Sequence, residues 1–238
     1  HKEYRRQRQM CIRDSPWCVL FVLSLIIMIT IVMRGGAGVY YLKYYVQRPE
    51  LTGLFLGGYS VSLAVGAAIT PLLTRHWDKR TLMTALMAIV GLLSCLMFFI
   101  PADMVWAIFA LNMLIGVALG PKSPLAFSMY ADSADYTEWS TGRRATAMTF
   151  AAATFSQKLG GALASAGIAW VLAGMGYVAN SAQSQASLTG IVLLLTVIPG
   201  VVALLAAWTM RFYPLDDGLL RRIQLELAAR KRDEPEHS

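Results

Sequence analysis

Long apolar runs alternate with short polar segments along almost the whole chain. A helix needs about 20 apolar residues to cross the ~30 Å hydrocarbon core of a bilayer. The runs that reach or approach this length are Trp17–Met33, Leu51–Thr74, Thr81–Ala102, Met104–Pro121, Ala145–Gly176 and Leu188–Met210. Within them only the fifth contains a charged side chain, Lys158. The pattern predicts an all-α membrane protein with six transmembrane helices.

Composition supports a membrane protein and argues against a soluble enzyme or a nucleic-acid-binding domain. Of the 238 residues, 56% are hydrophobic and 15% are charged, whereas soluble domains are roughly a quarter charged. The net charge of +7 comes from basic residues at segment ends and in the tails, so nucleic acid is not expected as a partner. No phosphate-binding, zinc-protease, nucleophile-elbow or dinucleotide motif occurs, and the three cysteines lack metal-site spacing. We expect no enzyme, no metal and no resident cofactor.

Basic residues also predict the orientation, because short cytoplasmic loops are enriched in Lys and Arg. With the N-terminus inside, the inner segments 75–80, 131–144 and 211–238 carry eleven Lys and Arg. The outer segments carry three, which are Arg34, Lys43 and Arg48. We therefore expect a multi-pass protein in the lipid bilayer of the inner membrane, with both termini in the cytoplasm.

The sequence divides into three parts. Residues 1–15 begin with His1 and have neither a helical apolar period nor a signal-peptide pattern, so we expect a non-native or disordered basic tail. Residues 16–213 are the predicted six-helix bundle, and residues 214–238 the predicted cytoplasmic tail. Within that tail, residues 218–230 predict a short amphipathic helix that either lies on the membrane surface or is solvated.

A glycine-rich stretch, Arg34–Gly38, follows the first apolar run, and four tyrosines follow the glycines. Glycine-rich backbone at the edge of a span favours a kinked or unwound helix end. Tyrosine is enriched at membrane interfaces. We therefore expect Arg34 at the outer boundary of the membrane.

Lys158 is the charge that most needs explanation. It lies about thirteen residues into the fifth run, ~20 Å along a helix, where a charge is normally turned toward a protein interior or a wet cavity. Thr154 lies one turn earlier on the same face, and Gln157 can donate and accept hydrogen bonds to a hydroxylated ligand. Lys158, Gln157 and Thr154 are candidate substrate or cation-coupling residues. The alternative is a lysine that snorkels to the interface.

Lys122 has a different interpretation. It lies ~28 Å from the outer end of its helix, so we expect its side chain to snorkel to the inner boundary. Pro121 and Pro124 on either side are expected to bend the helix.

Charged residues also gather between the fourth and fifth runs. Asp132, Asp135 and Glu138 recur at intervals of three, and Arg143 and Arg144 begin the next span. These opposite charges could form a salt-bridge gate that opens and closes during transport. An ordinary solvated loop with weak surface pairs explains them equally well.

All 14 carboxylates lie in loops, helix ends or tails. Cation-coupled carriers usually need carboxylates or unwound carbonyls within the membrane. The chain therefore looks like an incomplete carrier.

Five segments resemble the glycoside–pentoside–hexuronide cation symporters, the melibiose-carrier branch of the major facilitator superfamily. They are ADSADYTEWSTGRR, FSQKLGGALA, RGGAGVYYLKYY, TRHWDKR and GYVANSAQSQ, and the resemblance covers residues 16 to 232. That family has twelve helices in two halves, with substrate between them. The resemblance implies that this chain is the half with helices 7–12, and that its partner is the missing N-terminal six-helix half.

The same resemblance implies roles for single residues. Lys158 would lie beside the cation site, Thr154 in the sugar-facing region, and Asp132, Asp135 and Arg144 in the cytoplasmic gate. A further position is Ser123, where melibiose carriers have a sugar-pocket tryptophan, which argues against melibiose as the substrate. The implied function is symport of a glycoside, pentoside or hexuronide with Na⁺ or H⁺ by alternating access. The alternatives are a self-contained six-helix homodimeric carrier or channel, a lipid or drug carrier, and a non-transporting membrane scaffold.

Overall fold

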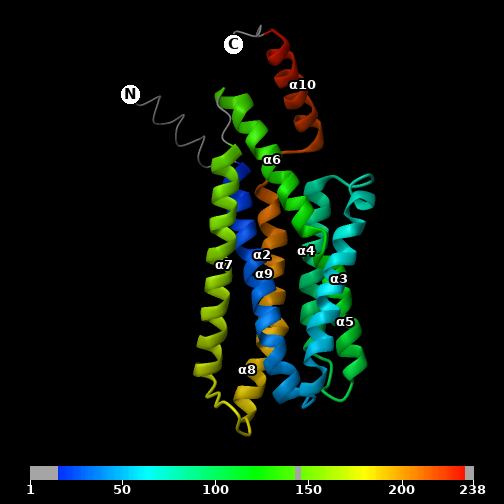
Figure 1. The fold of residues 1–238 in the computed structure, drawn as a ribbon, viewed down its shortest axis with the longest axis vertical. Helices are drawn as coiled ribbons and strands as arrows, with labels where there is room; N and C mark the ends of the chain where they lie inside the picture. Colours follow the sequence, from blue (N-terminus) through cyan, green and yellow to red (C-terminus); the bar gives the residue numbers. More distant parts are fainter. Residues whose placement is uncertain (1–15, 143–145, 234–238) are drawn as a thin grey trace.

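The structure, a computed structural model, describes residues 16–142 and 146–233. These residues form an elongated helical bundle (Figure 1). The elements are α2 (Pro16–Tyr40), the π-helix η1 (Tyr41–Tyr45), the short 3₁₀ helix η2 (Pro49–Leu51), α3 (Thr52–Leu73), α4 (Lys79–Met97), α5 (Val105–Leu119), α6 (Lys122–Thr141), α7 (Thr146–Gly174), α8 (Gln185–Leu195), α9 (Val197–Thr209), η3 (Met210–Phe212) and α10 (Asp217–Asp233). The predicted tail, residues 1–15, lies outside the described residues.

The expected all-α membrane fold is confirmed. Five helical segments of the described chain are long and apolar enough to cross a membrane, namely Pro16–Tyr45, Pro49–Leu73, Lys79–Met97, Val105–Thr141 and Gln185–Phe212. α7 is more polar, but its 29 residues make a helix ~44 Å long. It runs the length of the bundle beside α2 (Figure 1).

Two of these membrane-length segments are interrupted near their middle. α5 ends at Leu119 and α6 begins at Lys122, because the intervening Pro121 has no backbone N–H to continue the helical ladder. α8 and α9 meet at Thr196, which has φ −113° and ψ −83°. Pro199, in the first turn of α9, leaves the carbonyl of Leu195 without its helical donor.

α6 continues beyond the point where the sequence predicted an inner loop. The helix ends only at Thr141, where Gly142 adopts φ +69° and donates its N–H to the Glu138 carbonyl. Such a left-handed glycine is a common helix terminator. Asp132, Asp135 and Glu138 are therefore helical residues, and the expected loop begins ten residues later than its first carboxylate.

Of the kinked or unwound end expected at Arg34–Gly38, the unwound form is wrong. α2 stays helical through these residues and passes into η1, which carries Tyr41 into the core with no exposed surface. Gly36 serves helix packing, since a Cβ on it would lie 2.8 Å from Ile168 Cδ1 of α7. Gly160 of α7 has the same role, because its Cβ would lie 2.6 Å from the Leu25 carbonyl oxygen.

The two ends of the bundle differ. At one end, called the α10 end, lie the start of α2, the α3–α4 turn, the last turns of α6, and α10 (Figure 1). At the opposite end, called the far end, lie η1 and the α7–α8 loop, joined by Tyr44 Oη to Tyr177 Oη at 3.1 Å and by Lys43 Nζ to Asn180 Oδ1 at 2.7 Å.

α10 packs on α6 and buries Leu220, Ile223 and Leu227. The predicted amphipathic helix is therefore present and docks on the protein. Its position relative to the membrane surface stays a prediction.

Candidate functional site

A polar hollow lies between α2, α6 and α7. Its volume is about 60 Å³, which is room for a few water molecules. The lining residues are Ser24, Ile27, Met28, Lys122, Ser123, Ala126, Phe127, Tyr130 and Gln157. Phe127, at the rim, is 53% exposed, so the hollow reaches the bundle surface.

The polar groups of the hollow are connected. The hydroxyls of Ser24 and Tyr130 are hydrogen-bonded across α2 and α6, and the Gln157 side chain lines the same hollow. These groups can both donate and accept hydrogen bonds. The cluster suits a ligand with hydroxyl groups.

The hollow lies deep within the bundle. Ser24 is eight residues and Gln157 eleven residues from the α10 ends of their helices, which correspond to ~12 Å and ~17 Å. Lys122 lies ~25 Å from the far end, counted from Val105. Counted from those helix ends, all three distances are shorter than the ~30 Å thickness of a hydrocarbon region.

Lys122 lies at the start of α6, ~25 Å from the far end of its segment, close to the depth that the sequence predicted. α6 continues for 19 residues beyond it, to Thr141. The Lys122 side chain lines the hollow and is half-buried. Its snorkelling to the inner boundary stays a prediction.

α7 presents three different faces. With successive residues ~100° apart, Thr154, Lys158 and Ser165 fall within ~40° of one another and form an exposed polar stripe. The large exposed apolar side chains lie elsewhere around the helix, and the residues packed into the bundle lie on a third face. The exposed apolar residues are Phe155, Leu163 and Trp170, and the buried ones include Ser156, Gly160 and Ala164.

The predicted trio Lys158, Gln157 and Thr154 is thus divided. Gln157 lies between the buried face and the polar stripe, and it alone lines the hollow. Thr154 Oγ1 donates to the Phe150 carbonyl of its own helix at 2.9 Å. Lys158 is exposed, and in the described part of the chain it has no hydrogen-bond or ion-pair partner.

Arg34 is a buried residue that sequence reasoning misplaced. It is 2% exposed, and its guanidinium donates to Asn112 Oδ1 at 2.7 Å, to the Leu195 carbonyl at 2.9 Å and to Ser94 Oγ at 3.1 Å. The Leu195 carbonyl is the one that Pro199 leaves without a helical donor.

The Arg34 bonds join helices that are distant in sequence. Through Ser94, Asn112 and Leu195 the guanidinium connects α2 to α4, α5 and the α8–α9 break, and it lies 5.9 Å from the ring centre of Tyr59 in α3. The sequence did contain a signal for this burial. Glycines that follow an arginine can indicate close helix packing around it as well as the end of a membrane span.

The predicted gate carboxylates lie near the α10 end. Asp132 is buried and pairs with Lys79 at 2.6 Å, while Asp135 and Glu138 are half-buried on the same helix. Arg143 and Arg144 lie outside the described residues. The pair that the structure shows, Lys79–Asp132, joins α4 to α6 within one bundle.

The start of α4 holds Lys79 in place. Asp78 caps this helix by accepting from the Thr81 N–H at 3.0 Å. Partial burial acts to raise the pKa of Asp78, but the hydrogen bonds from Thr81 outweigh it and keep that pKa below its ordinary value. Tyr213 is a further neighbour of the Lys79–Asp132 pair. Burial raises the pKa of Tyr213, and the negative charge of Asp132 raises it further.

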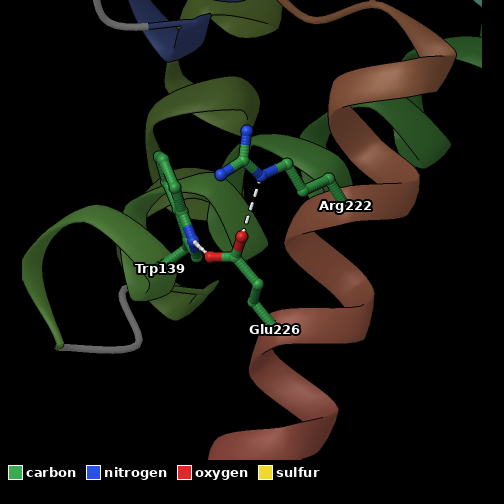
Figure 2. Close-up of polar contacts among 3 residues, drawn as sticks. All are labelled: Trp139, Arg222 and Glu226. Atoms are coloured by element: carbon green, nitrogen blue, oxygen red, sulfur yellow. Dashed lines mark hydrogen bonds and ion pairs between the residues drawn. The ribbon is translucent and has the colours of Figure 1, made fainter.

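α10 is fastened to the same end of α6. Figure 2 shows Glu226 between Trp139 and Arg222. Trp139 Nε1 donates to Glu226 Oε2 at 2.6 Å, and Arg222 Nε donates to Glu226 Oε1 at 2.8 Å. A movement of α6 is therefore mechanically linked to the tail helix.

Comparison with known proteins gives consistent matches. The family model described as MFS/sugar transport protein matches residues 1–217. The inner membrane symporter YicJ of Escherichia coli (strain K12) is 33% identical over 222 residues, 92% of this chain and 48% of that protein. From the same organism, the putative glycoside/cation symporter YagG is 31% identical over 220 residues, with the same two coverages.

A third relative, the glucuronide carrier protein homolog of E. coli (strain K12), is 27% identical over 225 residues, again 92% of this chain and 48% of that protein. The chain spans about half the length of the curated relatives it matches. The resemblance drawn from the sequence segments is confirmed.

Proposed function

This chain belongs to the MFS/sugar transport protein family, and from that premise we propose that it forms one half of a sugar:cation symporter. The family is one of transporters, so the chain is not an enzyme. The cargo is a glycoside, pentoside or hexuronide. The driving ion is Na⁺ or H⁺.

The observation that carries this proposal is the polar hollow at membrane depth. Transporters bind substrate near the bilayer midplane, between their structural repeats. Ser24, Tyr130 and Gln157 offer hydroxyl and amide groups there, which can replace the water around sugar hydroxyls. The hollow is small because it is one wall of a larger site whose other wall belongs to the second half.

Lys158 supports the same arrangement. An exposed ammonium halfway along a membrane-length helix is costly against lipid, whereas the apolar face with Phe155 and Trp170 suits lipid. We therefore assign the Thr154–Lys158–Ser165 stripe to the interface with an N-terminal six-helix half. There Lys158 would meet the cation-site carboxylates, and Thr154 and Gln157 would lie toward the sugar.

The α10 end is assigned to the cytoplasm of the inner-membrane protein. Because Arg34 is buried in the bundle, only Lys43 and Arg48 remain as basic residues of the far end. This increases the charge asymmetry that sets orientation. Both termini are then cytoplasmic.

In this orientation Asp132, Asp135 and Glu138, with Arg143 and Arg144, are the cytoplasmic gate. α4, α6 and α10 are already joined at this end by the Lys79–Asp132 and Trp139–Glu226 contacts. The two halves would close over the substrate by forming further ion pairs there.

The test is sugar binding by the full-length gene product, purified in detergent, with and without Gln157→Leu. The substitution keeps the side-chain size and removes both hydrogen-bonding groups, so affinity for the transported sugar is expected to fall about 10-fold or more. Gln224→Leu, on the exposed side of α10, is the matched control and should leave binding unchanged. Equal affinities for all three proteins would contradict the placement of the sugar.

A further inference from the structure

Lys122 is a cation inside the hollow, and no carboxylate is among the described residues that line it. The polar groups lining it with Lys122 are the neutral side chains of Ser24, Ser123, Tyr130 and Gln157. Among residues 16–142 and 146–229, Lys122 forms no hydrogen bond or ion pair. A half-buried ammonium at this depth needs either an anion or full hydrogen bonding to be stable.

Arg34 shows how this chain accommodates a cation that only holds helices together. Its guanidinium is surrounded by three oxygen acceptors within 3.1 Å. Lys122 has no such set, although Tyr130 and Gln157 lie in the same hollow. The difference indicates that the acceptor for Lys122 comes from outside the described chain.

Lys158 does not compete for that acceptor in the hollow. It lies on the exposed stripe of α7, beyond Gln157 at the rim. The stripe is the surface that we assign to the other half of the carrier. Lys122 instead opens onto the space where the sugar is placed.

We propose that Lys122 recognises an anionic sugar, binding its carboxylate or sulfonate while Ser24, Tyr130 and Gln157 bind the hydroxyls. This inference rests on the proposed sugar-transport function and narrows its substrate class. Lys122 would then be a specificity-determining residue. A neutral sugar would leave the ammonium desolvated and unpaired, and would bind more weakly for that reason.

The test uses the full-length gene product and sugars matched in pairs. Each pair differs only at C6: a methyl glycoside with CH₂OH is compared with its uronide, which has a carboxylate, and with its 6-sulfonate. Dissociation constants are measured by calorimetry for gluco and galacto forms of both anomers. We expect the best anionic sugar to bind about 10- to 100-fold more tightly than its neutral match.

Two substitutions separate recognition from a structural role. Lys122→Gln should abolish the preference for the anion while keeping affinity for the neutral sugar, and Lys122→Arg should retain the preference. Arg75→Gln, which removes a positive charge from the exposed α3–α4 turn, should change neither affinity.

The outcomes distinguish the two proposals. If the neutral member of every pair binds as tightly as the anion, the inference about Lys122 is overturned and sugar transport stands. Equal loss of both affinities in Lys122→Gln overturns it too, because that pattern means an ion pair with the other half. If no sugar of either charge binds, the proposed function fails, and the inference fails with it. A carboxylate preferred over a sulfonate, or the reverse, identifies the anionic group.

Discussion

Arg34, Lys122 and Lys158 are cations within the apolar segments, and of the three only Arg34 is buried and hydrogen-bonded within the described bundle. Arg34 fixes the meeting point of helices near the far end, and its acceptors include a carbonyl released by Pro199. Pro199 leaves the Leu195 carbonyl without a donor from its own helix, and Arg34 of α2 donates a hydrogen bond to that carbonyl. The arginine is thus a structural residue, whereas Lys122 and Lys158 await partners.

Replacing Arg34 by Met should destabilise the full-length protein strongly. The apolar side chain fills the space but leaves the oxygens of Asn112, Ser94 and Leu195 without their donor, at a cost of ~1–3 kcal/mol for each buried group. We expect the apparent melting temperature in detergent, measured by loss of the monodisperse peak, to fall by about 10 °C or more.

Arg48→Met is the matched control for Arg34. Arg48 pairs with Glu50 at 3.8 Å, and both side chains are 61% exposed, so the pair contributes roughly 0–1 kcal/mol. Its melting temperature should stay within about 2 °C of the parent. A similar small shift for Arg34→Met would show that the hydrogen-bonded cluster does not hold the helices.

At the scale of residues, the sequence predicted chemistry better than position. Lys158 lies within α7 as the length of its run predicted, and its depth in the membrane stays a prediction. Arg34 was misplaced because a charge was taken as the end of a span, while α2 continues past it. The Lys79–Asp132 pair was not foreseen, since its members are 53 positions apart and only tertiary packing joins them.

Helix packing depends on close backbone approach between α3 and α5. A Cβ on Gly66 would lie 2.2 Å from the Val117 carbonyl oxygen, and one on Gly120 would lie 2.4 Å from the Leu63 carbonyl oxygen. Neither backbone atom can move aside as a flexible side chain does. Small residues at such contacts are typical of membrane helix pairs.

Gly66→Ala should therefore separate α3 from α5 and lower the melting temperature by several degrees, since overpacking costs typically ~1–3 kcal/mol. Gly57→Ala, on the same helix with no atom within 4 Å of the new Cβ, should be neutral or slightly stabilising, because alanine favours helix over glycine by ~1 kcal/mol. Equal melting temperatures for Gly66→Ala and Gly57→Ala would contradict a close contact between α3 and α5 at Gly66.

Docking of α10 on α6 is a second feature at this scale. Trp139→Phe keeps the ring but removes the N–H that Glu226 accepts. A hydrogen bond to a charged group contributes ~1.5–3 kcal/mol, so the undocked fraction of α10 should rise about 10-fold or more.

Hydrogen exchange of the backbone amides in 217–229 measures that undocking. Faster exchange confined to this helix is expected for Trp139→Phe and not for Arg221→Ala, whose side chain is exposed. Unchanged exchange in Trp139→Phe would show that the Trp139–Glu226 hydrogen bond does not hold the helix on α6.

At the scale of the whole molecule, the all-helical fold followed from run lengths because the bilayer sets the length of a span. The site did not follow as completely. The hollow needs Ser24, Tyr130 and Gln157 from three helices, and no spacing in the sequence brings Ser24 to Tyr130 across 106 positions. The division of α7 into buried, polar and apolar faces became clear only once its buried side was known.

The surface of the described bundle differs in polarity from one side of α7 to another. One side of α7 suits lipid, and another carries Lys158 without a partner. Such a surface is stable in a membrane only when a second structure covers the polar stripe or water reaches it. The half-carrier account explains this asymmetry and the half-length match to relatives together.

The most direct test of the account is ion-driven sugar uptake by the full-length gene product in sealed proteoliposomes. Labelled sugars, neutral and anionic, are supplied outside, and an inward Na⁺ or H⁺ gradient is imposed or omitted. The account predicts accumulation above the external concentration only when sugar and one of these gradients are both present, and loss of that accumulation in Lys158→Gln. Equilibration without accumulation, or no uptake of any sugar, would contradict symport.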